Sequence, residues 1–565
     1  MHTSRARSRG AALIAAAATA ALALLAGCSS SGTNAAAGGA TGSTGGGSVP
    51  VAVAGASTTR PACNRPAATA PEAKAVDGVA SDHDITSFDG TTIRAHWFPV
   101  ASASAANPAP TVLMGPGWSL PGDTNADAVG VLGAINIATL REAGFNVLTW
   151  DPRGFGKSTG SAQVNDPEHE GRDVQALMDW VAAQPGVQLD APGDPRMGMV
   201  GGSYGGGIQL VTASTDCRVD AIVPVIAWHS LESSLFKADT VKAGWAGILQ
   251  SIAAAKSVDP HVPGSYQRSM ATGQVDPDDR AWFVARGPGD KVQDIHVPTL
   301  LIQGTVDGLF TLDEAITNFQ QLEQAGTPVS MLWYCGGHGV CLTKEGDPTR
   351  ISKAAIAWLR HNVKGETSVE VGPRIDIIDQ DGTRYTGADW PLPAGPPITA
   401  TGSGTLSLTA DGGSGPTTGT PAESQLLWSL VKPITPAKAA NAVNVPITTG
   451  SSTQVIVGAP TVELTYSGTS PANDRPARVF AQLVDDETGV VLGNQVTPIE
   501  ITLDGQNHTV KVPLEVVAFT AKPGATLTLQ LTPTTVAYAP PQLGGTVTFD
   551  TIAVSLPTVE VKPAS

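Results

Sequence analysis

The sequence predicts an α/β domain built on a largely parallel sheet, followed by an all-β domain. From about residue 83 to 365, apolar runs of strand length alternate with amphipathic helical segments. Such runs are typical of parallel strands that are buried beneath helices on both faces. After about residue 367, apolar and polar residues alternate with period two between Gly, Pro and Asn turns, which predicts a β-sandwich. A chain of 565 residues also exceeds what one hydrophobic core usually supports, which agrees with two domains.

The first domain, expected at residues 61–366, opens with a predicted hairpin, because HDITSFDGTTIRAHWFPV places an Asp-Gly turn between two alternating stretches. Further strands are expected at TVLMG, FNVLTW, RMGMVGG, AIVPVIAW, TLLIQG and VSMLWY, with helical patterns such as GRDVQALMDWVAAQ and LDEAITNFQQLEQAG between them. The connection between AIVPVIAW and TLLIQG is about 70 residues long, too long for an ordinary loop. Its helical pattern predicts a cap inserted above the sheet at about residues 228–297.

The second domain is expected at residues 367–565. Its predicted strands are GTLSLTA, PTVELTYSG, ARVFAQLVDD, HTVKVPLEVVAF, ATLTLQLTP and GTVTFDTIAVSLP, and no helix of note is expected among them. We therefore interpret this region as a β-sandwich.

Residues 1–27 have the pattern of a secretory signal, since three arginines without acidic residues precede an apolar run. The run ends in LLAGC, which resembles a bacterial lipobox. This resemblance implies cleavage before Cys28 and attachment of diacylglycerol to its sulfur. Residues 28–60 lack apolar periodicity and are expected to form a flexible tether. The alternative is a secreted protein in which Cys28 has no such role.

The net charge of −16 and the pI near 5.0 argue against a nucleic-acid partner, whose phosphates the protein would repel. No segment after the signal has the length of uninterrupted apolar sequence that a membrane span needs, so a lipid anchor is the only membrane contact that we expect.

The remaining cysteines are Cys63, Cys217, Cys335 and Cys341, an even number that fits disulfide pairing in an oxidising compartment. Three pairings are possible, and we favour Cys335 with Cys341 and Cys63 with Cys217. A zinc site at CGGHGVC is a weaker alternative, because no fourth ligand lies nearby. We expect neither a metal nor an organic cofactor.

The pattern G-x-S-x-G, in which a serine stands between glycines, occurs at Ser203 and at Ser158. Ser203 follows the strand MGMVGG and precedes the helical stretch GGIQLVTAST, a strand–turn–helix setting that exposes a serine on a sharp turn. Ser158 lies in the loop DPRGFGKSTGSAQV, and its surroundings also lack the first glycine of a phosphate-binding loop. Ser203 is therefore the candidate nucleophile.

A serine hydroxyl needs a base and an orienting carboxylate to attack at neutral pH. Asp307 in LLIQGTVDGLF and His338 in MLWYCGGHGVC each follow a predicted strand, where sites form in parallel sheets. His361 belongs to a helical pattern and His508 to the second domain. Asp313 is the rival acid, but TLDEA places it in the first turn of a helix.

An oxyanion hole requires two donors. The first is expected to be the N–H of Tyr204, directly after the nucleophile. The second should come from GPGWSLPGD, where Pro116 has no N–H and the N–H of Trp118 is the best candidate.

The chain resembles the α/β-hydrolase family of Xaa-Pro dipeptidyl-peptidases and bacterial cocaine esterase. The likeness is carried by WDPRGFGKSTGS, GMVGGSYGGGIQL, IAWHSLESSLF, IHVPTLLIQGTVDGLF and the histidine of GGHG, and it extends over about residues 80–560. It implies an α/β-hydrolase fold with a helical cap and a C-terminal jelly-roll. It also implies Ser203 as nucleophile, Asp307 as acid and His338 as base. Family members of the esterase type use a tyrosine in the oxyanion loop, whereas MGPGWSLPGD has none.

Trp228, Phe236 and Trp245 of the cap are candidates for the wall of an acyl or proline pocket, although packing of the cap onto the core is the simpler interpretation. Asp151 and Arg153 are expected to hold their loop rather than to contact substrate.

These observations predict a lipid-anchored, extracytoplasmic serine hydrolase that cleaves an amide or ester through an acyl-enzyme. A peptidase of the Xaa-Pro type is the first hypothesis for the substrate, and a carboxylic esterase or acylase is the second. An envelope acyltransferase and a non-catalytic surface binding module are the alternatives from other classes. The expected partner is a peptide or ester substrate, and the oligomeric state stays open.

Overall fold

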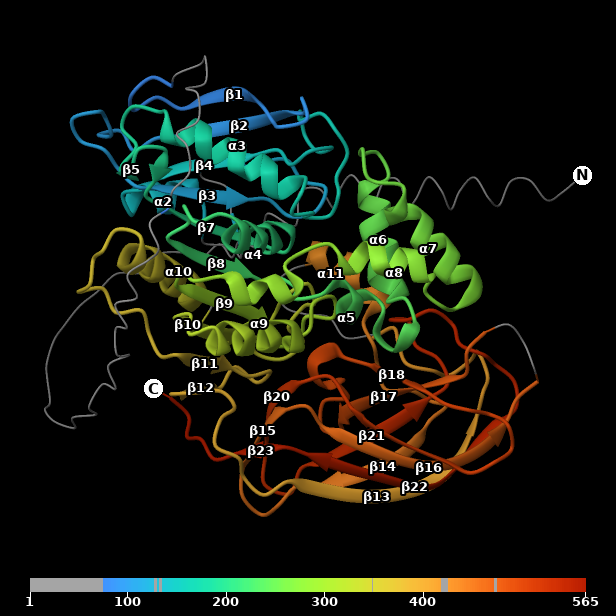
Figure 1. Ribbon diagram of the computed structural model, residues 1–565. Coiled ribbons are helices and arrows are strands. Elements are labelled where there is room, and N and C mark those ends of the chain that lie inside the picture. Colours follow the sequence, from blue (N-terminus) through green and yellow to red (C-terminus); the bar gives the residue numbers. More distant parts are fainter. Residues whose placement is uncertain are drawn as a thin grey trace, which may run out of the picture.

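The computed structural model describes residues 63, 75–126, 130–131, 135–347, 349–417, 425–471 and 475–564. The predicted signal peptide, Cys28 and the predicted tether lie outside the described residues. Two units are seen, an N-terminal unit that ends with strand β12 and a C-terminal unit that begins with strand β13 (Figure 1). No helix in the described ranges has the length and apolar character to span a membrane.

A 10-stranded mixed sheet forms the centre of the N-terminal unit. The predicted hairpin and all six predicted strands are confirmed, and the strands from β4 to β11 along the sheet pair in parallel. In spatial order the strands are β1 (Ser81–Thr86), β2 (Thr92–Phe98), β4 (Asn146–Trp150), β3 (Thr111–Gly115), β7 (Met197–Gly202), β8 (Ala221–Val225), β9 (Thr299–Gly304), β10 (Val329–Tyr334), β11 (Ile375–Ile378) and β12 (Arg384–Gly387). A separate small ribbon pairs β5 (Leu189–Ala191) with β6 (Asp194–Pro195).

Helices cover both faces of this sheet, as the apolar strands require. One face packs with α3 (Glu170–Ala182), α4 (Tyr204–Thr215) and α9 (Leu312–Gln324), and the other with α2 (Ile137–Glu142) and α10 (Thr349–Asn362). The unit therefore has a hydrolase-like α/β fold.

Short helices occupy the long connection between β8 and β9, where the sequence predicts the cap. They are α5 (Leu231–Leu235), η1 (Lys237–Asp239), α6 (Ala243–Ala253), α7 (His261–Thr272), α8 (Pro277–Val284) and η2 (Gly289–Asp294). Helices α6, α7 and α8 stand beyond the carboxyl ends of the strands (Figure 1), whereas η2 packs against α4 and α9.

The C-terminal unit contains two four-stranded antiparallel sheets whose side chains pack into one apolar core. The first sheet has the order β13 (Ile398–Ser407), β22 (Thr546–Leu556), β16 (Thr461–Thr469), β19 (His508–Pro513), and the second has the order β14 (Val443–Thr448), β21 (Thr526–Thr532), β17 (Arg478–Asp485), β18 (Thr497–Glu500). A third sheet pairs β20 (Val517–Ala521), β15 (Gln454–Gly458) and β23 (Thr558–Val559).

The division of the chain differs from the prediction at one point. β11 and β12 follow residue 366 but join the sheet of the N-terminal unit, so that unit extends past the predicted boundary. The sequence of a strand indicates whether the strand is buried, but not which sheet it joins. After α10 the chain returns to the first sheet, where β11 pairs with β10. The helix α11 (Gln425–Val431), followed by η3 (Lys432–Ile434), is a second difference, since no helix was expected there.

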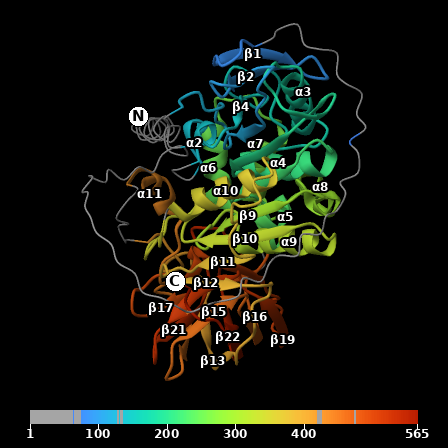
Figure 2. The ribbon, with the colours of Figure 1, turned by 90° about the vertical axis from the view of Figure 1, so that its left-hand side faces the viewer.

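The two units share a buried boundary beside the β10–β12 edge (Figures 1 and 2). Val455 of β15 and Ala518 of β20 belong to the same apolar cluster as Ile377 of β11. The hydroxyl groups of Tyr385 and Thr520 lie 2.7 Å apart across this boundary. Arg478, only 1% exposed, donates from β17 to cap carbonyls at 2.9–3.0 Å.

Candidate active site

Ser203 stands between β7 and α4 in a backbone conformation that L residues rarely adopt, with φ 56° and ψ −115°. The neighbouring glycines allow this turn to form. A Cβ on Gly205 would lie 2.1 Å from the carbonyl oxygen of Gly115, and a Cβ on Gly201 would lie 2.7 Å from it. The close approach of β3, β7 and α4 therefore places the Ser203 hydroxyl at the carboxyl edge of the sheet, at the start of a helix.

Asp307 and His338 reach Ser203 from the loops that follow β9 and β10. His338 Nε2 lies 2.8 Å from Ser203 Oγ, and His338 Nδ1 lies 2.8 Å from Asp307 Oδ2. The backbone N–H of His338 also donates to Asp307 Oδ2 at 3.0 Å. The structure thus brings together the three side chains that the sequence singles out, in the order serine, imidazole, carboxylate.

The carboxylate of this triad is shielded from water. Asp307 is 0% exposed, and its Oδ1 accepts hydrogen bonds from the N–H groups of Leu309 and Phe310 at 2.9 Å. His338 is 5% exposed and packs edge-on against Phe310 and Trp245, at ring-centroid distances of 5.1 and 5.7 Å. These contacts limit the imidazole to one orientation, in which Nδ1 meets the carboxylate and Nε2 meets the hydroxyl.

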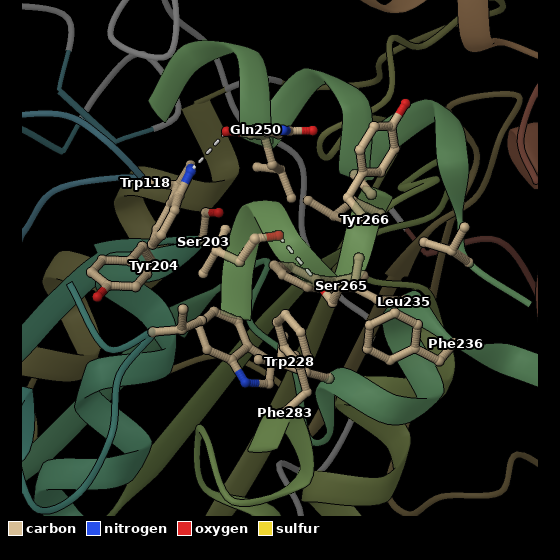
Figure 3. A pocket seen from close by; sticks show the side chains of 18 residues that line it. Trp118, Ser203, Tyr204, Trp228, Leu235, Phe236, Gln250, Ser265, Tyr266 and Phe283 are labelled. Atoms are coloured by element: carbon tan, nitrogen blue, oxygen red, sulfur yellow. Dashed lines mark hydrogen bonds between the residues drawn. The ribbon is translucent and has the colours of Figure 1, made fainter. Parts of the chain in front are cut away.

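Ser203 opens into a cavity beneath the cap, of about 700 Å³ including space open to solvent. Figure 3 shows Trp118 and Tyr204 on one side of Ser203, and Phe236 and Phe283 on the other. The wall is made mostly of apolar side chains, and no described lining residue carries a charge. The lining residues are Trp118, Val164, Ser203, Tyr204, Trp228, Leu231, Leu235, Phe236, Val241, Ala246, Leu249, Gln250, Val262, Ser265, Tyr266, Phe283, Leu309 and Phe310.

Trp118 and Tyr204, the two residues expected to supply the oxyanion donors, both line this cavity. Tyr204 is the first residue of α4, where helical N–H groups have no intrahelical acceptor. Trp118 lies in the loop after β3, its ring 5.2 Å from that of Tyr204, and its indole N–H donates to the Leu249 carbonyl of the cap at 3.1 Å. The cap is thereby joined to the loop expected to hold the oxyanion.

A buried carboxyl group supports the residue after the nucleophile. The Tyr204 hydroxyl donates to Glu170 at 3.1 Å, and Asn165 donates from its side-chain amide to the Tyr204 carbonyl at 2.7 Å. Burial, with the nearby negative charge of Asp173, raises the pKa of Glu170 to about 7. Burial and the Glu170 charge likewise raise the pKa of the Tyr204 phenol well above its ordinary value. The phenol therefore serves as a neutral brace for the α4 N-terminus.

Several sequence candidates lie elsewhere. Ser158 Oγ donates to the Asp151 carbonyl at 2.6 Å, and Asp151 accepts from Gly122 N–H at 2.8 Å. Arg153 forms a two-fold hydrogen bond with Asp173, at 2.7 Å for each contact. All three residues thus hold loops.

Asp313, the rival acid, and Trp245, the third candidate for the pocket wall, also lie outside the cavity. Asp313, in α9, faces Glu515 and Lys237, and burial together with the Glu515 charge raises its pKa. Trp228 and Phe236 line the cavity, whereas Trp245 packs against His338 from outside it.

The two expected disulfides are present, Cys63–Cys217 and Cys335–Cys341, and the second closes the loop that carries His338. Its sulfur atoms are therefore not available to zinc. Cys63, Cys217 and Asp216 form one close group of possible ligand atoms in the described part of the chain, but its sulfurs are likewise joined to each other.

Sequence reasoning missed most of the residues that line the cavity, and three of them illustrate why. Phe310 borders both the cavity and His338. Its position three residues after Asp307 was the one feature of the sequence that could have indicated a place at the site. Gln250 and Tyr266 line the cavity from α6 and α7 (Figure 3). No spacing in the cap distinguishes these two residues from ordinary helix-surface side chains.

Comparison with known proteins extends this description. Residues 89–339 match the model of the X-Pro dipeptidyl-peptidase (S15) family. A polyketide transferase from a Penicillium species is 27% identical over 146 residues, which are 26% of this chain and 44% of that protein. An uncharacterized 31.7 kDa protein of Escherichia coli is 34% identical over 87 residues, 15% of this chain and 29% of that protein. The chain thus spans less than half the length of these curated relatives.

Solved structures share the fold over most of the chain. A CocE/NonD family hydrolase from Staphylococcus aureus aligns with a TM-score of 0.58 and 13% identity, covering 88% of this chain and 100% of that one. An α-amino acid ester hydrolase aligns with a TM-score of 0.62 and 14% identity, covering 90% and 100%. At these identities the likeness shows the fold alone. The solved structures therefore show the fold, and the match to the S15 family model adds a likeness to that family over residues 89–339.

Proposed function

We propose that the chain hydrolyses a carboxylic ester or amide through an acyl-enzyme on Ser203. The observation that carries the proposal is the continuous line of hydrogen bonds from Ser203 through His338 to Asp307. Ser203 Oγ attacks the substrate carbonyl carbon and gives its proton to His338 Nε2. Asp307 holds Nδ1–H and stabilises the imidazolium that forms.

The leaving group departs in the second half of this step. The N–H groups of Tyr204 and Trp118 hold the negative oxygen of the tetrahedral intermediate. When the intermediate collapses, the bond to the leaving group breaks and His338 returns the proton to that group. Water then attacks the acyl-Ser203 carbonyl with His338 as base, which releases the acid and restores the hydroxyl.

Labelling with a fluorophosphonate probe tests this assignment. The wild-type chain should be labelled and should turn over acyl substrates, while Ser203→Ala should do neither and should keep its circular dichroism spectrum. Ser158→Ala is the matched control and should be labelled like the wild type. Labelling that survives in Ser203→Ala would show that another residue is the nucleophile, and a chain that is never labelled would favour a non-catalytic binding module.

The cavity favours an uncharged, apolar acyl group over a free dipeptide. A peptidase of the Xaa-Pro type must bind the protonated amino terminus of its substrate. An ammonium group buried without an opposite charge costs several kcal/mol. No described residue of the wall carries a charge, whereas aromatic and aliphatic side chains cover most of it. An esterase or acylase therefore fits the wall better than the first hypothesis does.

A substrate series distinguishes these specificities. Each methylene added to the acyl group of a nitrophenyl ester should raise kcat/KM by up to about four-fold until the cavity is full, because its burial contributes about 0.8 kcal/mol. Xaa-Pro anilides with a free amino group should be poor substrates, and their N-acetylated forms should be better. The reverse order within that pair would contradict the proposed acyl class and leave the Ser203 mechanism intact.

Acyl transfer to an acceptor other than water is the second candidate, because the matched relatives include polyketide transferases. Hydroxylamine and defined alcohols offered together with the ester would reveal it as a hydroxamate or a new ester. Release of free acid alone would favour hydrolysis.

We place the protein on the outer side of the membrane with a lipid on Cys28. The signal-like residues 1–27, the LLAGC motif and the two disulfides support this location. Labelled palmitate should enter the wild-type chain in a bacterial host and should not enter Cys28→Ser.

The shared core of two four-stranded sheets supports a C-terminal β-sandwich of the jelly-roll type.

A further inference from the structure

A turn of the C-terminal unit lies against both loops that carry the triad. This turn comprises η4 (Leu492–Asn494) and Gln495, and it connects β17 with β18. The Gln495 side-chain amide donates to the carbonyl oxygen of Asp307, 188 residues away in sequence. The Asn494 side-chain amide donates to the Val340 carbonyl, two residues after His338, at 3.1 Å.

These contacts are built into the interior. Asn494 is 8% exposed and Gln495 is 9% exposed. Asn494 also adopts φ 52°, a left-handed conformation that asparagine tolerates better than most residues. The Gly493 N–H donates to the Gln380 side chain of the N-terminal unit at 2.8 Å, which holds the turn from its other end.

Each triad loop carries a glycine that faces this turn, where a Cβ would be in ordinary van der Waals contact with Asn494. A Cβ on Gly339, next to His338, would lie 3.5 Å from Asn494 Nδ2. A Cβ on Gly308, next to Asp307, would lie 3.9 Å from the Asn494 carbonyl oxygen. The turn therefore contacts the residue beside the acid and the residue beside the base.

The two loops also contact each other, because the His338 N–H donates to Asp307 Oδ2 at 3.0 Å, and the Cys335–Cys341 disulfide closes the loop that carries His338. The hydrogen bond to the Asp307 carbonyl restrains the backbone that carries the carboxylate. The hydrogen bond to the Val340 carbonyl restrains the backbone segment that carries His338. Misplacement of a catalytic group by about 1 Å can lower a rate by about 10²-fold. A hydrogen bond on each loop from one rigid turn fixes their separation.

We propose that Gln495 and Asn494 are positioning residues, through which the C-terminal unit sets the distance between Asp307 and His338. The C-terminal unit is then part of the catalytic apparatus rather than an appended binding module. This inference rests on the proposed function, because it concerns the triad that acts there.

The test compares two variants of the full-length chain with an interface control. Gln495→Met keeps side-chain length but removes the donor, and Asn494→Gly keeps the left-handed backbone but removes the amide. Each should lower kcat by about 10- to 100-fold and leave KM within about two-fold. Tyr385→Phe removes a hydrogen bond from the same boundary in which neither triad loop takes part, and it should keep wild-type kcat and KM.

A second measurement separates positioning from simple stability. The low-field proton NMR signal of His338 Nδ1–H should shift or broaden in Gln495→Met and Asn494→Gly and stay unchanged in Tyr385→Phe. Variants that melt earlier but keep wild-type kcat and an unchanged signal below their Tm would overturn the inference. So would an equal loss of kcat in Tyr385→Phe.

Failure of the proposed function gives a different result. If Ser203→Ala keeps the activity of the wild-type chain, the triad is not the catalyst and the proposed function is wrong. If the activity requires Ser203 but both turn variants retain wild-type kcat, only the positioning role is wrong.

Discussion

The Asp307 carboxylate orients His338 from a position that water does not reach. It is 0% exposed, and its Oδ1 accepts hydrogen bonds from two backbone N–H groups. Its Oδ2 is therefore available to accept the hydrogen bond from the imidazole. This arrangement selects the tautomer that carries the proton on Nδ1, so that Nε2 is free to accept the Ser203 proton.

Asp307→Asn should lower kcat by about 10⁴-fold with little change in fold, because an amide can donate to Nδ1 and stabilise the wrong tautomer. Steady-state kinetics with a nitrophenyl ester and circular dichroism would measure the two effects. Asp313→Asn, at the rival acid in α9, serves as the control and should retain most of the activity. A large loss in the control alone would reverse the assignment of the acid.

Glu170 should make the stability depend on pH. Its pKa is raised from 4.5 to about 7 by burial. Between these values the folded chain holds a proton that the unfolded chain has lost, so stability falls as the pH rises and levels off above about 7. The decrease from this group should be about 3 kcal/mol in the free energy of unfolding.

Chemical denaturation between pH 4.5 and 8 would measure this decrease. Glu170→Gln should show a flatter profile than the wild type, and Glu168→Gln, at an exposed neighbour, should show the wild-type profile. Identical slopes in all three proteins would mean that Glu170 ionises normally in the fold.

At the scale of elements, the turn between β7 and α4 requires glycine for reasons of space. A Cβ on Gly205 would meet the Gly115 backbone, which cannot rotate away as a flexible side chain would. The strained conformation of Ser203 depends on this close packing of two strands and a helix.

Gly205→Ala should therefore lower the free energy of unfolding by about 1–3 kcal/mol and also lower kcat, since the displaced turn carries the nucleophile. Denaturant titration and kinetics on the same preparation would show both changes. Gly450→Ala is the control, because the nearest atoms to its Cβ would be those of the Gln454 side chain at 3.6 Å. A wild-type rate in Gly205→Ala would show that the turn tolerates more space than the packing indicates.

At the scale of the whole molecule, the two units depend on each other. Lys237 of the cap pairs with the buried Glu515 of the C-terminal unit at 2.6 Å, and Arg478 donates to three cap carbonyls. Burial opposes ionisation of Glu515, but the ammonium groups of Lys237 and Lys242 outweigh it and lower its pKa. Separation of the units would leave these charges and donors without partners.

We therefore expect the two units to unfold in a single cooperative transition. Differential scanning calorimetry of the full chain would show one heat-absorption peak, and a variant with Arg478→Met should show one peak at a lower Tm. Lys522→Met, which alters an exposed ion pair within the C-terminal unit, is the control and should melt like the wild type. Two well-separated peaks in the wild type would contradict this expectation.

The sequence by itself predicted the strands of the first unit, favoured the Cys63–Cys217 and Cys335–Cys341 pairings among three, and singled out Ser203, Asp307 and His338 as the candidate triad. The strands and the serine follow from short-range physics, because buried strands need apolar runs and a strained turn needs glycine beside its serine. The tertiary structure alone decided that β11 and β12 join the first sheet, that Trp245 faces His338, and that Gln495 reaches Asp307. Such contacts join residues as far as 188 positions apart, and they depend on how whole units pack, which no local pattern encodes.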